Sequence, residues 1–212
     1  MDWKKAFEET PPPTASKKKD LKKEVEESKS HRRNTECLVR TDKHIFRRAF
    51  SETQLLDAVG IDFKNGESYH CITGGDVDSL SYLKCVLRQQ NLDYCLFSTW
   101  CMAAEDILCF GEYLEKGLIK KLDAYVGEIF PGSYKIEYQM LKDLFEKYKC
   151  GRIAVFKNHS KIYAGTGNKF SFGIETSANI NTNPRTENGC ITIGSDIFEF
   201  YKQYFDGIKS FE

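Results

Sequence analysis

The stretch YHCITGGDVDSLSYLKCVLRQQNLDYCLFST, residues 69–99, holds two apolar segments of strand length with a helical pattern between them. Residues 69–73 and 94–99 are short runs rich in apolar and aromatic residues, which is typical of buried strands. Between them, residues 77–89 repeat leucine at a spacing of three and then four residues, so the leucines share one face of a helix. The stretch therefore predicts a strand, a helix and a second strand in succession.

The same alternation continues along the chain. It predicts helices at residues 103–116 and 136–148, and strands at residues 122–126 and 152–156. Strands that alternate with helices pair in parallel through helical crossovers. We therefore expect an α/β fold with a mixed, mostly parallel sheet sandwiched between helices.

Beyond the last of these strands the pattern changes to paired strands. Residues 159–163 and 170–175 flank a glycine-containing turn at 165–168, which predicts a hairpin. A last strand is expected at residues 190–193 and a last amphipathic helix at 196–208.

Composition divides the chain into three parts. Residues 1–36 contain three successive prolines and three successive lysines but almost no large apolar residues, which predicts a disordered, charged N-terminal tail. Residues 37–66 are expected to be a connecting segment, and residues 67–212 a single globular domain.

The net charge of the chain is zero, but the charges are unevenly distributed. Residues 1–48 hold 14 Lys and Arg against 9 Asp and Glu, whereas the remainder holds 17 against 22. A basic arm can contact nucleic acid through its phosphates, although a solvated tail is the simpler interpretation.

The eight cysteines include no C-x-x-C pair, so we expect no zinc site, no disulfide framework and no bound metal or cofactor. The N-terminus lacks the apolar run of a secretory signal, and no stretch approaches the ~18 apolar residues that span a bilayer. These features predict a protein of the reducing cytoplasm with no membrane partner.

Polar residues that suit phosphodiester cleavage cluster around the expected hairpin. Without a metal, such cleavage needs a nucleophile, an acid for the leaving oxygen, and fixed donors for the phosphoryl oxygens. His159 and Lys161 are two residues apart on an expected strand, so both side chains should project from one face. Ser177 and Asn179 follow the next strand and can donate to the same phosphate, while Glu187 can accept the second ring hydrogen of the histidine.

The pattern resembles the HKD motif of the phospholipase D superfamily. It is carried by His159-Ser160-Lys161, by Thr176-Ser177-Ala178-Asn179, and by Glu187-Asn188 before the last expected strand. The resemblance covers about residues 155–193 and is closest to bacterial and phage-type nucleases with one motif per chain.

The resemblance implies a role for each residue. His159 would be the nucleophile that forms a phosphohistidine, or the general acid of a partner site. Lys161 and Asn179 would bind the phosphoryl oxygens, Ser177 would donate a hydrogen bond nearby, and Glu187 would orient the imidazole. Members with a single motif pair two chains about a two-fold axis, so a homodimer is expected.

The sequence departs from the family pattern at three places. Thr166 stands where an acidic residue is usual, Thr176 replaces a glycine, and the interval from Lys161 to Ser177 is slightly long. None of the residues that the resemblance assigns to chemistry is missing.

Other features offer alternatives. Thr73-Gly74-Gly75-Asp76-Val77-Asp78-Ser79 is similar to the phosphate loop of ATP pyrophosphatases but is one residue too long. A tight turn with Asp76 or Asp78 capping the helix explains it as well, and the loop could also border the catalytic cleft. Arg185 and Lys157 are candidate substrate-binding residues, and Trp100 is a candidate base-stacking platform.

Three hypotheses follow from the sequence. The first is a metal-independent phosphodiesterase, a nuclease acting through a phosphohistidine at a dimer-shared site. The second is a catalytically inactive phospholipase D-like module that binds nucleic acid or assembles a phage-type complex. The third is a nucleotide-dependent enzyme that uses residues 73–79.

Overall fold

The computed structural model describes residues 43–49, 51–60, 62–74, 77–181 and 185–211. The tail expected at residues 1–36 lies outside these ranges.

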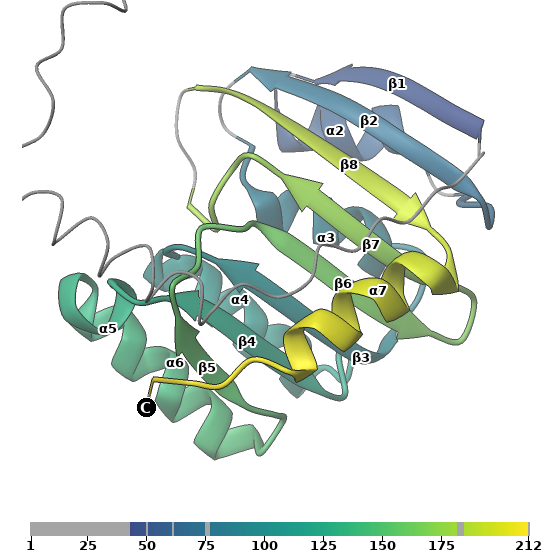
Figure 1. The fold of residues 1–212 in the computed structure, drawn as a ribbon. Coiled ribbons are helices and arrows are strands. Elements are labelled where there is room, and N and C mark those ends of the chain that lie inside the picture. The colour runs from purple at the N-terminus through teal and green to yellow at the C-terminus, as the bar shows by residue number, and fades with distance from the viewer. Residues whose placement is uncertain (1–42, 50, 61, 75–76, 182–184, 212) are drawn as a thin grey trace, which may run out of the picture. The chain divides into compact units, whose positions relative to one another are not determined.

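The described strands form one eight-stranded sheet in the order β1-β2-β8-β7-β6-β3-β4-β5 (Figure 1). Six strands run in one direction and only β6 and β8 run against them, so the mixed, mostly parallel sheet expected from the sequence is confirmed. Their bounds are β1 Lys43–Ala49, β2 Glu67–Gly74, β3 Leu92–Thr99, β4 Leu122–Gly127, β5 Ile153–Phe156, β6 Ile162–Gly167, β7 Ser171–Thr176 and β8 Thr186–Ile193.

Helices cover both faces of the sheet (Figure 1). Helices α2 to α6 share one apolar core with one face, and α7 covers the opposite face around β6 and β7. Their bounds are α2 Glu52–Val59, α3 Ser79–Leu87, α4 Ala104–Glu115, α5 Phe130–Ser133, α6 Lys135–Tyr148 and α7 Ser195–Asp206.

Alternating residues of the central strands supply the two cores. In β3, Phe97 stacks on Phe110 of α4 with ring centroids 4.8 Å apart, while Leu96 faces the α7 core. In β4, Tyr125 packs against Phe205 of α7 at 4.7 Å. Because both faces are covered, these strands are largely apolar, which explains why the sequence shows short apolar runs.

Arg152, the residue before β5, binds the C-terminus of α7. Arg152 Nη2 donates to Phe205 O at 2.8 Å and to the Tyr125 hydroxyl at 3.0 Å. A cation at the negative end of the helix satisfies carbonyls that have no partner within the helix. This contact places α7 across the sheet.

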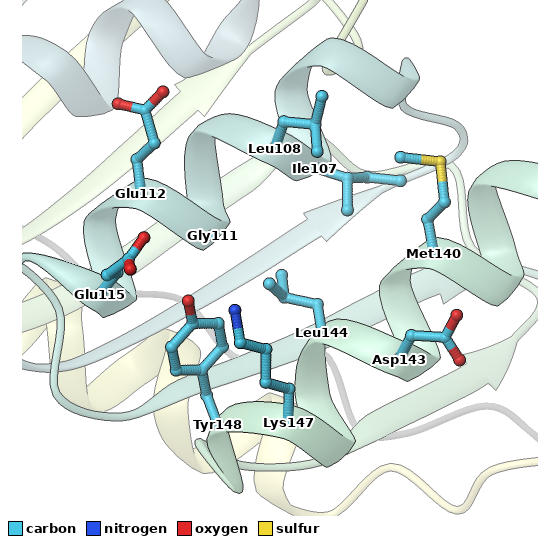
Figure 2. A pocket seen from close by; sticks show the side chains of 10 residues that line it. All are labelled: Ile107, Leu108, Gly111, Glu112, Glu115, Met140, Asp143, Leu144, Lys147 and Tyr148. Atoms are coloured by element: carbon cyan, nitrogen blue, oxygen red, sulfur yellow. The ribbon is translucent and has the colours of Figure 1, made fainter.

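On the other face, α4 and α6 approach closely because one position has no side chain (Figure 2). A Cβ atom at Gly111 would lie 3.2 Å from Leu144 Cδ1. Ile107, Met140 and Leu144 line a cavity of about 530 Å³ between the two helices, with Glu112 at its charged rim.

The region expected to be a connecting segment, residues 37–66, contains structure that the sequence did not predict fully. Strand β1 pairs in parallel with β2, and α2 is capped by the Ser51 hydroxyl, which accepts from Gln54 N at 3.3 Å.

Two further findings concern the described residues. Their seven cysteines are free thiols. None of their helices has the length and apolar character required to cross a bilayer.

Candidate active site

The predicted site residues gather at one edge of the sheet. Strands β2, β3, β5 and β7 end at this edge, and the antiparallel strands β6 and β8 begin there. His159 and Lys161 precede β6, Ser177 and Asn179 follow β7, and Glu187 is the second residue of β8. The strand order places β6, β7 and β8 side by side, so residues far apart in sequence meet.

His159 and Lys161 lie in the connection between β5 and β6, so their expected place on a strand is wrong. The two side chains nevertheless meet. Lys161 Nζ lies 2.9 Å from His159 Nδ1 and donates to the His159 carbonyl at 2.7 Å. The imidazole is exposed and the lysine is only 8% exposed.

The side chain of a buried asparagine holds this connection through hydrogen bonds, in place of strand pairing. Asn158 Nδ2 donates to Ser98 Oγ at 2.9 Å, to Thr99 O at 3.1 Å and to Tyr125 O at 3.0 Å. Its Oδ1 accepts from both the amide and the hydroxyl of Ser160, at 3.0 and 2.7 Å. Asn158 therefore fixes the backbone around His159 to the ends of β3 and β4.

Burial makes the environment of Lys161 unfavourable for a cation. Burial lowers the pKa of Lys161, and the nearby Glu187 carboxylate opposes this decrease. An ammonium has three donors and no acceptor. When Lys161 is charged, His159 Nδ1 is therefore the acceptor, and the proton of the neutral ring is on Nε2.

Ser177 and Glu187 form a second pair beside the first. The Ser177 hydroxyl donates to Glu187 Oε2 and accepts from Asn188 N at 3.0 Å. Nδ1 of the imidazole faces Lys161, and the expectation that Glu187 accepts a hydrogen bond from the ring stays a prediction. The contacts of Glu187 with this group of residues are the hydrogen bond from Ser177 and the electrostatic effect of its carboxylate, which raises the pKa of Lys161.

Asn179 joins the site to the start of α3. Its carbonyl accepts from Ser79 N at 3.2 Å, and its buried Oδ1 has no hydrogen-bond partner among the described residues. A buried polar atom without a partner is unusual and is found at binding sites.

The rival phosphate loop is described only in part, since Gly75 and Asp76 lie outside the described residues. Asp78 caps α3 by accepting from Ser81 N at 2.9 Å, as one interpretation of the sequence expected. Ser79 N donates to the Asn179 carbonyl and Ser81 N to Asp78, so these two amides at the start of α3 are not available to a pyrophosphate. The described part of the loop fits a capped turn that borders the site.

The two tentative substrate-binding residues have different places. Lys157 and His159 line the same cleft of about 390 Å³, between residues 156–162 and α7. Arg185 is exposed and immediately precedes β8. Trp100 lies beside the imidazole, with ring centroids 5.3 Å apart.

Sequence reasoning missed Asn158 and the contribution of α7. A signal for Asn158 was present, because it is the first uncharged polar residue after the apolar strand β5 and it adjoins His159. Nothing local links α7 to residues 156–162, which are about 40 positions away along the chain.

Comparison with known proteins gives a structural likeness only. No family model and no curated protein sequence matches the chain. Polyphosphate kinase from Porphyromonas gingivalis is similar in structure, with a TM-score of 0.51 and 13% identity over 68% of this chain. Phosphatidylserine synthase from Haemophilus influenzae Rd KW20 gives a TM-score of 0.46 and 12% identity over 66% of this chain.

The chain spans 26% of the length of the kinase structure and 37% of that of the synthase. At such low identity the likeness to the kinase concerns the fold and does not extend to activity. The fold is the mixed α/β arrangement of a phospholipase D-like domain.

Proposed function

We propose that this protein is a metal-independent phosphodiesterase of the phospholipase D type that acts on nucleic acid. The observation that carries the proposal is the pairing of exposed His159 with buried Lys161, beside Ser177 and Glu187, at one edge of the sheet. The polyphosphate kinase, a member of the phospholipase D superfamily, shares the fold and is consistent with the proposal.

In the proposed reaction, His159 Nε2 attacks phosphorus and the bond to the leaving oxygen breaks. A second histidine protonates that oxygen, and water then hydrolyses the phosphohistidine. Lys161 and Asn179 bind the phosphoryl oxygens, and the donors reduce the cost of the charge that develops on them.

The contact between Lys161 and His159 has a consequence for this mechanism. While the ammonium donates to Nδ1, Nε2 of a neutral ring carries a proton and suits an acid rather than a nucleophile. When a phosphate draws the ammonium away, Nδ1 can take the proton and free the Nε2 lone pair. Substrate binding would thus convert His159 into the nucleophile.

The second histidine requires a second chain. Among the four histidines, only His159 has a lysine two residues later. We therefore propose a homodimer in which each active site contains the His159 and Lys161 pair of both chains, related by a two-fold axis.

The decisive test is covalent trapping on His159. The full chain is incubated with ³²P-labelled oligonucleotides in excess chelator and quenched in alkali, which preserves phosphohistidine. We expect a labelled protein that is absent from the His159→Ala variant and present in a His70→Ala control. Label retained by His159→Ala would overturn the proposal.

A catalytically inactive nucleic-acid-binding module is the alternative. Asn179 Oδ1 is an acceptor without a partner among the described residues, and it can accept from an N–H group of a base in either case. A pure dimer that binds oligonucleotides and never cuts them, with or without chelator, would favour the binding module.

A further inference from the structure

A cleft with an aromatic wall adjoins His159 on the α7 side of the molecule. Its volume is about 390 Å³, which lies in the range of small-molecule binding sites. Phe200 and Tyr204 of α7 line one side, while Phe156, Lys157, His159 and Ile162 line the other. Neither the motif nor the proposed chemistry uses this space.

We infer that this cleft binds the unpaired base of the nucleotide next to the scissile phosphate, by stacking on Tyr204 and Phe200. The inference rests on the proposed function, because it takes the phosphate on His159 as its reference point. It adds a preference for single-stranded nucleic acid, since only an unpaired base can enter a pocket of this kind.

The two aromatic rings are held in place before any ligand binds. Tyr204 is 45% exposed and meets buried Phe205 edge to face, with centroids 5.2 Å apart. Phe200 meets buried Tyr201 at 5.3 Å and 70°. Rings braced by buried neighbours lose little conformational freedom when they stack, so more of the stacking energy contributes to affinity.

The chemistry of the lining favours a flat heterocycle over an acyl chain. Five of the residues that line the cleft are phenylalanines or tyrosines: Phe156, Phe200, Tyr201, Tyr204 and Phe205. Stacking on such rings is independent of base identity, which predicts little sequence preference. Lys157 is exposed on the side of the cleft opposite α7 and can neutralise a neighbouring phosphate.

The test measures binding by full-length His159→Ala protein, which cannot cleave the probe. Two fluorescent probes of equal length and charge are compared, a single-stranded DNA oligomer and an oligomer made entirely of abasic sites. We expect the oligomer with bases to bind more tightly. Tyr204→Ala in the same background should weaken its binding about tenfold and leave the abasic probe unaffected.

Two variants control for structural damage. Tyr204→Phe retains the ring and should bind as the parent does. Phe211→Ala removes another exposed aromatic outside the cleft and should also have no effect. Equal affinity for both probes, or equal loss in Tyr204→Ala and Phe211→Ala, would overturn the inference.

The outcomes separate this inference from the proposed function. Binding that depends on Tyr204 supports the inference that a base stacks in the cleft, even if the wild-type protein cuts nothing. The absence of cutting would count against the proposed phosphodiesterase activity. Cleavage by wild-type protein together with normal binding by Tyr204→Ala would overturn the cleft alone. Tyr204-dependent hydrolysis of a short-chain phospholipid, without binding of either oligomer, would assign the cleft to an acyl chain and overturn it.

Discussion

Lys161 lies at a buried position, which favours the uncharged form of its side chain. It is only 8% exposed, and burial lowers its pKa. Its two hydrogen bonds go to the ring and the carbonyl of His159, so it is held beside the residue that we assign to attack phosphorus. Such a residue is expected to be retained for function at some cost in stability.

Replacing Lys161 by methionine should therefore separate activity from stability. Methionine fills a similar volume without a charge, so the free energy of unfolding should stay the same or rise by about 1 kcal/mol. Phosphodiesterase activity should fall at least about a hundredfold, because the phosphoryl oxygens lose their cation. Urea unfolding and cleavage assays give both quantities, with Lys169→Met at the opposite edge of the sheet as control. A strongly destabilised variant would show that Lys161 has mainly a structural role.

Asn158 illustrates the reverse case, a neutral residue whose hydrogen bonds are nearly all satisfied inside the protein. Substitution by alanine leaves the Thr99 and Tyr125 carbonyls without their donor. We expect a loss of about 2–3 kcal/mol in the free energy of unfolding and a fall in kcat larger than the change in KM.

The control for Asn158→Ala is Asn168→Ala, at an exposed position in the turn between β6 and β7. It should change neither stability nor kcat. If kcat is normal in Asn158→Ala protein that is still folded, the network does not position His159.

At the scale of elements, the first turn of α4 contains a partly buried carboxyl group, that of Asp106. Burial raises the pKa of Asp106 to about 7, and the Asp78 carboxylate at the start of α3 adds to the increase. The folded state therefore keeps a proton that the unfolded chain loses between about pH 4 and pH 7. Stability should fall as pH rises through this window, because the folded state binds more protons there.

Asp106→Asn should remove that loss. At pH 8 the variant should be more stable than the wild type by an amount on the order of 2 kcal/mol, after allowance for partial exposure of the side chain. At pH 4 the two should be equal. Thermal or urea unfolding at both pH values tests this, with Asp143→Asn on the exposed side of α6 as control. A difference that is independent of pH would contradict the explanation.

At the scale of the whole molecule, one His159 and Lys161 pair per chain makes the proposed activity a property of a dimer. Mixing wild-type protein with an equal amount of His159→Ala and allowing exchange should lower activity to about a quarter of that of the same total of wild type, because mixed dimers are inactive. If each chain acted independently, half of the wild-type activity would remain. His70→Ala protein serves as the neutral partner, and sedimentation gives the oligomeric state.

Local patterns in the sequence were enough for the order of helices and strands from β2 to α7, with the exception of α5. Leucine spacing indicated α3, and short apolar runs indicated β3 and β4. The short helix α5 and the strand β1 were missed, since β1 is a strand chiefly through its pairing with β2. The hairpin was found, but its turn lies a few residues later than expected, after Gly167.

The sequence by itself determined the α/β class and the candidates His159, Lys161, Ser177, Asn179 and Glu187, because periodicity and short motifs depend on neighbours along the chain. Only the tertiary structure decided which of these side chains contact one another, that Asn158 holds the connection, and that α7 forms a cleft with Tyr204 beside His159. Those contacts depend on strand order and helix packing, which join residues tens of positions apart and leave no periodic signal in the chain.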